Sequence, residues 1–492
     1  MFLIIPLILS AFTHFWNPLG FPRLYFDEGI YMRRAMHVLS GQGPQEEVTF
    51  YDHPYFGQLF LAGVLGSIGY PHSLVPPNTG SNMQYFIEML YFVPRIMMGI
   101  LAVIDTFVIY KISEYYYSRK IALISSTLFA VMPSTWFTRW ILLDSIQLTL
   151  LLSSILFAVY TRNSKDKNKR NRPKLPLILL SGIFLGLAIF TKIPAFTMIP
   201  LVGFLVYINN RNMDSKNLLG LWLIPVILIP LVWPAYSISI GRFNFWIAGI
   251  LWQVHRESQP FLASIDSFLR NDPILLTLGI AGIAFAIIKK DFLLLLWSIP
   301  FIIFLFLIGY VSSYHLIPLL PVLCIAGAVL IGDILNKLDK RNVLRTLVVY
   351  AIASSIGIFG LINTTILITT NVNSSYFKSA AFVVQYLQNI NHGSVNYNFN
   401  KITVIADPFF LWIPQYIFQL DFNYRMYYDS TPIKTQRALL IVDHGLTSAM
   451  SRNDDAAKQL KLIYHSPKTT ILRTFREYGN KDNQISIYQY VK

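Results

Sequence analysis

The chain has 492 residues, of which 54% are hydrophobic and only 13% charged, and its formal net charge is +15. Soluble globular proteins carry about 25% charged residues, so this composition excludes an ordinary soluble enzyme, and the 15% of aromatic residues excludes a disordered chain. The single cysteine, Cys324, excludes a disulfide framework and a cysteine-based zinc site.

The apolar residues come in long uncharged blocks, which is typical of a polytopic membrane protein. A bilayer-spanning helix needs about 20 mostly apolar residues, and the first, fifth and sixth of the predicted spans are shorter than that. We expect eleven spans in all, at residues 2–16, 94–112, 121–138, 141–160, 175–190, 195–209, 218–237, 273–288, 292–309, 316–335 and 346–368.

Basic residues predict which connections lie in the cytoplasm. If the connections alternate between two sides, one side collects 18 lysine and arginine residues against five acids. Short basic loops stay in the cytoplasm, so the positive charge indicates topology rather than a nucleic-acid partner. The segments on this side are 111–120, 161–174, 211–216, 289–291 and 337–345.

This topology places the N-terminus in the cytoplasm of a multi-pass cell-membrane protein. Residues 17–93, residues 238–272 and the chain after about residue 369 are then extracytoplasmic. Residues 2–16 lack the positive n-region and the small-residue cleavage site of a signal peptide, so we expect a retained helix.

The first outer loop, residues 17–93, is too long for a passive connection. It holds two apolar amphipathic stretches, Gly29–Leu39 and Phe56–Ile68. Both are compatible with helices that lie in the membrane interface.

Residues 371–492 form a predicted extracytoplasmic α/β domain, separate from a transmembrane domain of residues 1–370. Asp407 and Asp443 each follow a predicted strand, where they suit either a ligand site or, more simply, a turn or helix cap. The sequon at Asn373 is a candidate glycan acceptor. Strands are expected at Ile402–Ala406, Leu439–Val442, Leu462–Tyr464 and Ile485–Val491, and helices at 376–390 and 409–418.

Charged residues at the outer ends of the spans are the candidate functional residues, because charge is costly at membrane depth. Each also has an ordinary structural explanation. Asp27 and Glu28 suit a helix N-terminus, Arg95 an interfacial anchor, and Lys192 a snorkelling lysine. Arg139 and Asp144 suit a pair that holds a helix turn, and Asp105, within a span, suits a hydrogen-bonded interior acid.

The order of these pieces resembles the dolichyl-phosphate-mannose protein mannosyltransferases and the related aminoarabinose transferases. That family has an Asp-Glu pair after its first helix, a Pro-Pro-Leu-Gly-Lys surface stretch, an arginine that opens the second helix, and an Arg-x4-Asp turn. Here Tyr55 and Gln58 replace the second proline and the lysine of the surface stretch. The matching residues are Phe26–Tyr31, Asp52–Leu59, Arg95, Thr138–Asp144, Gly186–Lys192 and Tyr314–Pro321.

The resemblance implies a membrane glycosyltransferase that moves one sugar from a polyprenyl (dolichyl) phosphate to an acceptor hydroxyl on a protein or glycolipid, with inversion. Such a transfer needs a carboxylate base and cations at the leaving phosphate. We expect Asp27, with Glu28 as neighbour or substitute, to be the base, and Arg95 and Lys192 to bind the phosphate. Supporting roles are expected for Arg139, Asp144, His53 and Tyr31.

No cofactor is required by this chemistry, although a divalent metal is compatible with the sequence. His53 with Asp52, and His255 with Glu257, offer nitrogen and oxygen ligands. The expected partners are the lipid-linked donor, the acceptor and membrane lipids, with no nucleic acid.

Two other classes of protein fit parts of the sequence. A transporter or flippase of lipid-linked sugars is the first, but it would typically show inverted repeats. A non-catalytic membrane receptor with an outer α/β domain is the second. It would not require Asp27, Arg95 and Lys192 to face a common pocket.

Overall fold

The structure, a computed structural model, describes most of the chain. Of the segments used above, Glu257, residues 212–214, residues 340–342 and most of the basic run 161–174 lie outside the described residues. The described residues are 2–46, 51–74, 82–162, 174–211, 215–256, 261–339, 343–393, 402–427, 429, 432–433, 435–477 and 480–492.

The chain forms two compact units. The helical unit consists of residues 1–16, 45–58 and 96–367, and the C-terminal unit of residues 17–44, 59–95 and 368–492. The C-terminal unit therefore contains most of the first outer loop as well as the predicted α/β domain.

All eleven predicted spans lie on helices. The helices at these positions are α1 (Ile4–Phe15), α4 (Met83–Tyr116), α5 (Arg119–Val131), α6 (Leu143–Tyr160), α7 (Leu175–Thr191), α8 (Ile199–Asn209), α9 (Ser215–Ser239), α12 (Pro273–Lys289), α13 (Phe292–Leu307), α14 (Leu320–Asp339) and α15 (Val343–Ile368).

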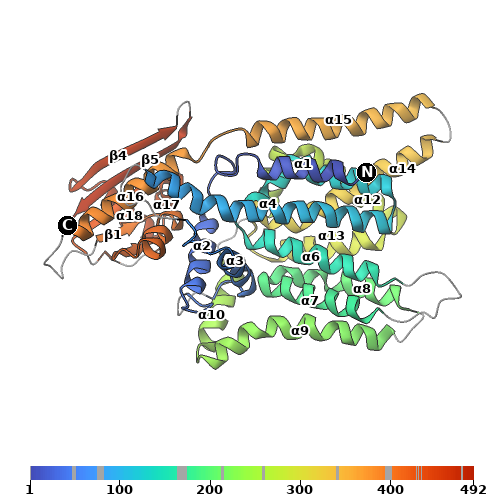
Figure 1. Cartoon of the computed structure of the whole chain (residues 1–492), viewed down its shortest axis with the longest axis horizontal. Helices are drawn as coiled ribbons and strands as arrows, with labels where there is room; N and C mark the ends of the chain where they lie inside the picture. The colour runs from blue at the N-terminus through green and yellow to red at the C-terminus, as the bar shows by residue number, and fades with distance from the viewer. Residues whose placement is uncertain are drawn as a thin grey trace. The chain divides into compact units, whose positions relative to one another are not determined.

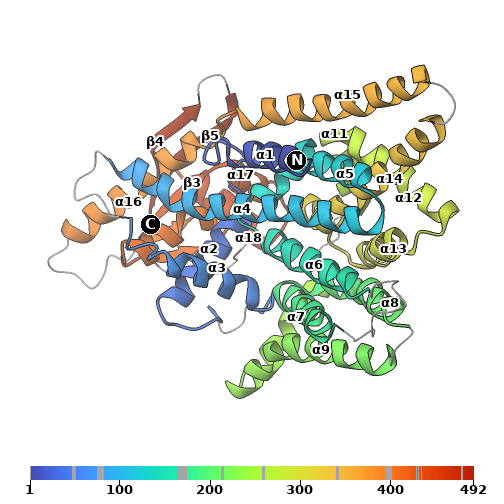
Figure 2. The same cartoon turned by 45° about the vertical axis from the view of Figure 1, so that its right-hand side comes forward.

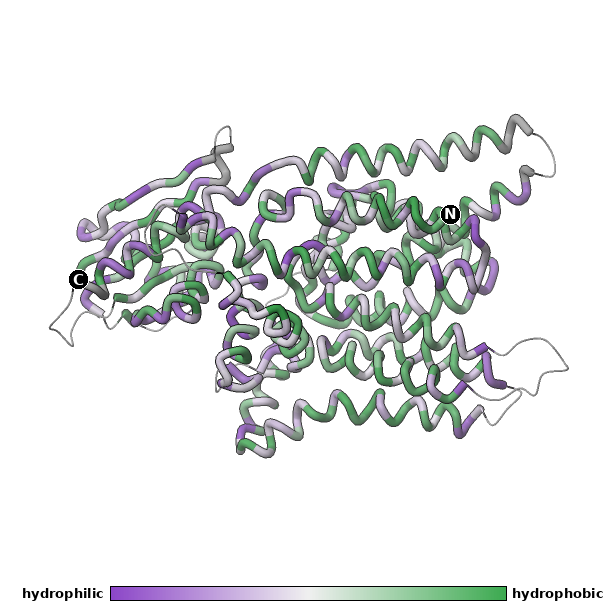
Figure 3. The backbone as a smooth tube through the Cα atoms, in the orientation of Figure 1, coloured by the Kyte–Doolittle hydropathy of each residue, from purple (hydrophilic) through white to green (hydrophobic). Residues whose placement is uncertain are grey.

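Within the described residues, five helical segments are long and apolar enough to cross a membrane, or up to seven if two sharply bent pairs each form one span. The chain is thus a multi-pass membrane protein, and the count of eleven stays a prediction. Figure 3 shows hydrophobic residues along α9 and α15. Only 22% and 17% of their apolar windows are buried, which suits helices that face lipid.

Helices α6 to α9 lie side by side in the helical unit (Figures 1 and 2). Gly182 and Gly186 of α7 allow α9 to approach closely. A Cβ atom at these positions would lie 2.4 Å from the carbonyl oxygen of Trp222 and 2.5 Å from that of Pro225. This glycine pair at a spacing of four is a common contact between membrane helices. It fixes α7, which is directly followed by the predicted site residue Lys192.

The C-terminal unit is built on a five-stranded sheet with the order β2-β1-β3-β5-β4. Strand β1 pairs in parallel with β2 and β3, and β5 pairs antiparallel with β3 and β4. The strands are β1 (Ile402–Ile405), β2 (Asn423–Arg425), β3 (Arg437–Val442), β4 (Thr469–Glu477) and β5 (Asn480–Val491).

Helices cover the sheet. Helices α17 (His444–Met450) and α18 (Asp455–Tyr464) pack through Leu446 and Leu460 on Ala438 and Leu440, and α16 (Ser374–Gly393) packs on β4 and β5. The strand predicted at Leu462–Tyr464 is wrong. These residues end α18, because Leu460 is buried while Leu462 is 74% exposed, which is a helical rather than an alternating pattern.

The helix predicted at 409–418 is two short turns, Pro408–Phe410 and Ile413–Ile417. The candidate glycan acceptor Asn373 is 0% exposed, and its amide nitrogen donates to the carbonyl oxygens of Leu19 and Pro22. The glycosylation prediction is therefore wrong for the folded protein.

Both predicted amphipathic segments are helices: α2 (Phe26–Leu39) and α3 (Phe56–Ser67). The polar residues of α2 do not form the solvated face that an interfacial helix would show. Arg33, Arg34 and His37 are 1%, 5% and 8% exposed, so α2 is buried among its neighbours in the C-terminal unit. The remaining helices are α10 (Phe243–Val254) and α11 (Phe261–Asn271).

Candidate active site

The acidic pair of the sequence motif lies in the first turn of α2. The helix begins at Phe26, three residues earlier than predicted, so Asp27 and Glu28 are inside it. The Glu28 carboxylate accepts a hydrogen bond from the Tyr25 backbone N–H at 2.9 Å and forms a capping box. Acids are favoured at this end of a helix, so the capping interpretation is confirmed for Glu28.

Arg95 of α4 holds the same Glu28 in a two-point ion pair. Its Nε and Nη2 atoms donate to the two carboxylate oxygens at 3.0 and 2.8 Å, and its Nη1 donates to the carbonyl oxygens of Pro18 and Pro22. Arg95 and Glu28 are 1% and 0% exposed. Through these contacts Arg95 fixes the loop before α2 to the first turn of that helix. Phosphate binding by Arg95 stays a prediction, and it would require this pair to open.

Two further carboxylates share the surroundings of Asp27. Gly29 packs directly on the turn that follows β1, since a Cβ atom there would lie 2.4 Å from the Phe409 backbone nitrogen. Asp407 begins that turn and caps it through the Phe409 N–H at 3.1 Å. Asp443 follows β3 and caps α17 through the Leu446 N–H at 2.9 Å. The cap interpretation of both strand-end acids is thus confirmed.

The buried position of these acids raises their pKa values. Burial raises the pKa of Asp407 well above its ordinary value, and the charges of Asp443 and Asp27 raise it further. Burial also raises the pKa of Asp443. The pKa of Tyr427 rises through burial and through the two strand-end acids. The sequence placed Asp407 and Asp443 directly after predicted strands. It contained no pattern that would predict their position near Asp27.

In the helical unit, Lys192 and Asp144 form the second buried ion pair. Lys192 directly follows α7, and Asp144 lies in the first turn of α6. The lysine Nζ lies 2.8 and 2.7 Å from the two carboxylate oxygens, and the side chains are only 5% and 2% exposed. Each charge also has the sign that its helix end favours.

The expected partner of Asp144 was Arg139, but Asp144 is paired with Lys192. Arg139 is 2% exposed, and its Nη2 donates to the carbonyl oxygen of Trp16. Because Arg139 and Asp144 are only five residues apart, the sequence suggested a local ion pair. The observed pair instead joins Asp144 in α6 to Lys192 after α7. Asp105, expected to be a hydrogen-bonded interior acid, is buried in α4 beside the Thr149 hydroxyl, which interacts with its carboxylate without forming a hydrogen bond of ordinary geometry.

Several polar groups gather near Lys192. The Tyr314 ring centroid lies 5.0 Å from its Nζ. Lys192, Arg256 and His53 all contribute to the electrostatic field at His315. The His315 Nδ1 accepts a hydrogen bond from the Ser312 N–H at 2.8 Å, so a neutral ring carries its proton on Nε2.

Sequence reasoning missed Arg256, although it noted His255 beside it. The Arg256 guanidinium lies 4.1 Å from the Tyr310 ring centroid, and its Nη1 donates to the Gln253 side-chain oxygen at 3.3 Å. The sequence offered only one indication of Arg256, which is an arginine between a histidine and a glutamate in a predicted outer loop.

The structure also describes the predicted supporting residue Tyr31 and the candidate metal ligands His53 and His255. Tyr31 is 2% exposed on α2. His53 lies 3.7 Å from the carboxylate of Asp52, and His255 is exposed at the end of α10. Among the described residues, no three side chains of histidine, cysteine, aspartate or glutamate are placed to hold a metal ion.

Comparison with known proteins gives a family match. The family model of the dolichyl-phosphate-mannose-protein mannosyltransferases matches residues 2–256, just over half of the chain. No curated protein sequence matches the chain significantly.

Two solved structures share the fold. One is ArnT from Cupriavidus metallidurans bound to undecaprenyl phosphate, with a TM-score of 0.58, 13% identity and coverage of 99% of this chain and 97% of that chain. The other is the archaeal oligosaccharyltransferase AglB from Archaeoglobus fulgidus in complex with an inhibitory peptide and a dolichol-phosphate, with a TM-score of 0.59, 12% identity and coverage of 99% and 75%.

Proposed function

The chain belongs to the dolichyl-phosphate-mannose-protein mannosyltransferase family and is a membrane glycosyltransferase, and we propose that it transfers one sugar from a polyprenyl phosphate to an acceptor hydroxyl at the extracytoplasmic face, with inversion. The acceptor is a hydroxyl of a protein or of a glycolipid. The basic segments on one side of the predicted topology support this sidedness, with a cytoplasmic N-terminus.

The proposed step is a single displacement. The acceptor oxygen attacks the anomeric carbon while a carboxylate accepts the hydroxyl proton. The bond from that carbon to the phosphate oxygen breaks, and its electron pair stays on the lipid phosphate. The reaction therefore needs one base and a positive environment for the phosphate, and no redox partner.

Asp27 is the best candidate for the base. The observation that carries this assignment is the engagement of Glu28, whose carboxylate is already bound by Arg95 and by the Tyr25 N–H. Glu28 would have to break these bonds to take a proton. Asp27 lies near the buried Asp407 carboxyl, since the charge of Asp27 acts on that group.

The leaving phosphate needs cations that can reach it. Lys192 remains the sequence-based candidate, and it would act together with Asp144, which holds it. Arg256 and His315 are additional candidates, because the His315 Nε2–H and the Arg256 guanidinium are hydrogen-bond donors in the same neighbourhood. Donors positioned in advance stabilise developing charge better than water does.

The test is a transfer assay with matched variants. Purified protein is incubated with radiolabelled polyprenyl-phosphate sugars and a membrane extract, and labelled product is measured. Asp27→Asn is expected to lower the rate by about 10²-fold or more, while thermal unfolding changes less than in Glu28→Gln. Glu28→Gln is the control for a structural acid and is expected to lower stability as well as rate. Full-rate transfer by Asp27→Asn would remove Asp27 as the base.

The transporter hypothesis has no support in the family match or in the two structures above. The same assay separates it from the transferase, because a flippase moves labelled lipid between leaflets without forming a labelled acceptor.

A further inference from the structure

Gln147 is a buried polar residue of α6 to which the proposed reaction assigns no role. It is 1% exposed and lies three residues after Asp144, so the two side chains are neighbours on one face of the helix. Helix α7 lies beside α6 (Figures 1 and 2). Asp144 holds the ammonium of Lys192 after α7, and Gln147 contacts the main chain of the same lysine.

The side-chain amide nitrogen of Gln147 bridges the last turn of α7 and the residue that follows it. Its Nε2 donates to the carbonyl oxygen of Ala188 at 3.3 Å and to that of Lys192. The Ala188 oxygen also accepts the Lys192 N–H at 3.0 Å, and the Lys192 oxygen also accepts the Ala195 N–H at 3.3 Å. Gln147 therefore anchors the chain at the point where α7 ends.

These bonds affect the position of Lys192 more than they affect stability. Each of the two carbonyl oxygens keeps its main-chain donor if Gln147 is removed, so neither becomes a buried acceptor without a partner, which is the costly outcome. The lysine side chain has a flexible four-carbon stem, so the place of its ammonium depends on where its main chain is fixed. Asp144 fixes the ammonium end of Lys192 and Gln147 fixes the main-chain end, both from α6.

We propose that Gln147 is a positioning residue for Lys192 in the transfer reaction, and this inference rests on the proposed function. In the proposed step Lys192 stabilises the charge that develops on the leaving phosphate, which requires its ammonium to be in place before the bond breaks. A misplacement of about 1 Å can lower a rate about 10²-fold. Gln147 acts through Lys192 and contacts none of the reacting atoms, so it is not a catalytic residue.

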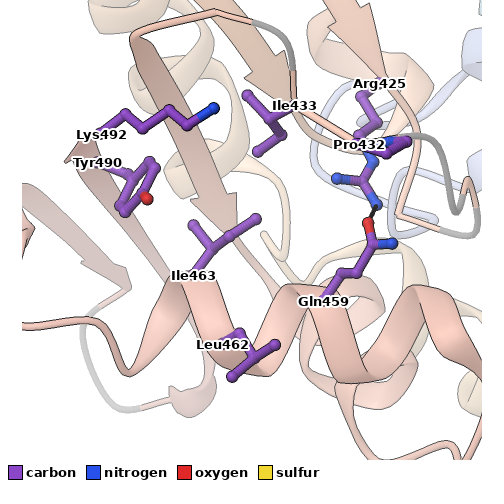
Figure 4. A pocket seen from close by; sticks show the side chains of 8 residues that line it. All are labelled: Arg425, Pro432, Ile433, Gln459, Leu462, Ile463, Tyr490 and Lys492. Carbon is purple, nitrogen blue, oxygen red and sulfur yellow. Dashed lines mark hydrogen bonds between the residues drawn. The ribbon is translucent and has the colours of Figure 1, made fainter.

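Two variants of Gln147 and two controls test the proposal. Gln147→Met removes the donor at similar length, and Gln147→Glu keeps the shape but places an oxygen against two carbonyl oxygens. Ser154→Ala is the structural control, because Ser154 Oγ donates to the Ser181 carbonyl oxygen at 2.8 Å and so joins the same two helices about two turns away. Gln459→Met is the glutamine control. Gln459 accepts a hydrogen bond from Arg425 at 3.0 Å in a pocket of the C-terminal unit that is lined by none of the proposed site residues (Figure 4).

The measurements are transfer kinetics and the affinity of the full-length protein for polyprenyl phosphate without acceptor. Both Gln147 variants are expected to lower kcat/KM for the donor about 10-fold or more and to raise the Kd for polyprenyl phosphate about 10-fold. A smaller fraction of folded protein would lower kcat but leave this Kd unchanged, so the Kd separates positioning from stability. Ser154→Ala and Gln459→Met are expected to keep the native Kd.

A native rate and Kd in both Gln147 variants would overturn the positioning role. An equal rise of Kd in Ser154→Ala would overturn it too, because any loosening between α6 and α7 would then have the same effect. If the native protein neither binds polyprenyl phosphate nor transfers sugar, the proposed function fails, and hydrogen exchange still tests the anchor. Gln147→Met should speed exchange of the Lys192 and Ala195 amides, and Ser154→Ala should not. Equal exchange in these two variants would show that Gln147 does not anchor this segment.

Discussion

The Lys192–Asp144 pair yields the sharpest test of how the helical unit supports the reaction. Lys192→Met would leave the Asp144 carboxylate 2% exposed with both oxygens deprived of their ammonium partner. Breaking a buried pair from one side costs about 3–5 kcal/mol. At about 1.4 kcal/mol per tenfold change, that lowers the ratio of folded to unfolded protein by roughly 10² to more than 10³.

A double-mutant cycle separates bracing from phosphate binding. Asp144→Asn added to Lys192→Met removes the stranded charge, so the double variant is expected to recover part of the lost stability. If Lys192 acts only by holding Asp144, transfer activity should recover with it. If Lys192 binds the donor phosphate, stability should recover while transfer stays low and KM for the donor stays high.

The assays are chemical unfolding in detergent and transfer kinetics. Lys111→Met is the control, because Lys111 and Glu114 form a half-exposed pair at 3.0 Å and exposed pairs contribute only about 0–1 kcal/mol. If Lys192→Met were no more destabilised than Lys111→Met, the argument from burial would be refuted.

Two further predictions concern the C-terminal unit. Gly29→Ala places a Cβ atom 2.4 Å from the Phe409 backbone nitrogen, so unfolding experiments should show a loss of about 1–3 kcal/mol. Gly63→Ala in α3, where a Cβ atom meets nothing within 4 Å, should be neutral or stabilising by up to about 1 kcal/mol. The raised pKa of Asp407 means that its contribution to stability is complete below the ordinary aspartate pKa and is lost as pH rises toward its folded value. Asp407→Asn keeps an acceptor for the Phe409 N–H, so in thermal melts it should exceed the native protein in stability at pH 8 and approach it at pH 4.

The helices could be predicted from the sequence because each is a long apolar run whose ends are marked by charge, proline or glycine. The pairing of charged side chains between elements could not be predicted. Glu28 and Arg95, and likewise Asp144 and Lys192, were identified as functional candidates one by one, yet their partners lie on other elements of the chain. Periodicity reports only which face of an element is buried. It contains no information on which distant element supplies the counter-charge.

The strands were predicted less completely, for a related reason. Strand β2 has only three residues and β4 alternates weakly at the sheet edge, where Ile471 is 56% exposed. Such edge strands have no apolar pattern for sequence reasoning to detect. The carboxylates at the ends of β1 and β3 were located correctly along the chain, but their proximity to Asp27 follows from the packing of Gly29 on Phe409, which is a tertiary contact.

Asn373 offers a final test of how the acidic motif is held in place. Its amide nitrogen donates to the carbonyl oxygens of Leu19 and Pro22 at 2.8 and 2.7 Å, and its side-chain oxygen accepts the Leu24 N–H at 2.9 Å. These residues lead directly into α2, so a side chain more than 300 positions away fixes the approach to Asp27. Asn373→Asp keeps the size and the acceptor but replaces the donor by an oxygen that faces carbonyl oxygens.

We expect Asn373→Asp to lose about 1–3 kcal/mol for each bond that becomes repulsive or unmade, with a larger loss of transfer rate than of donor binding. Asn371→Asp is the matched control, because the Asn371 side chain serves only as an acceptor for the Asn373 N–H at 3.3 Å in the described structure, and a carboxylate can replace it. Unfolding and transfer should both be near native in that variant. If Asn373→Asp behaved like Asn371→Asp, the segment before α2 would not need this anchor, and the position of Asp27 would have to depend on the Glu28–Arg95 pair alone.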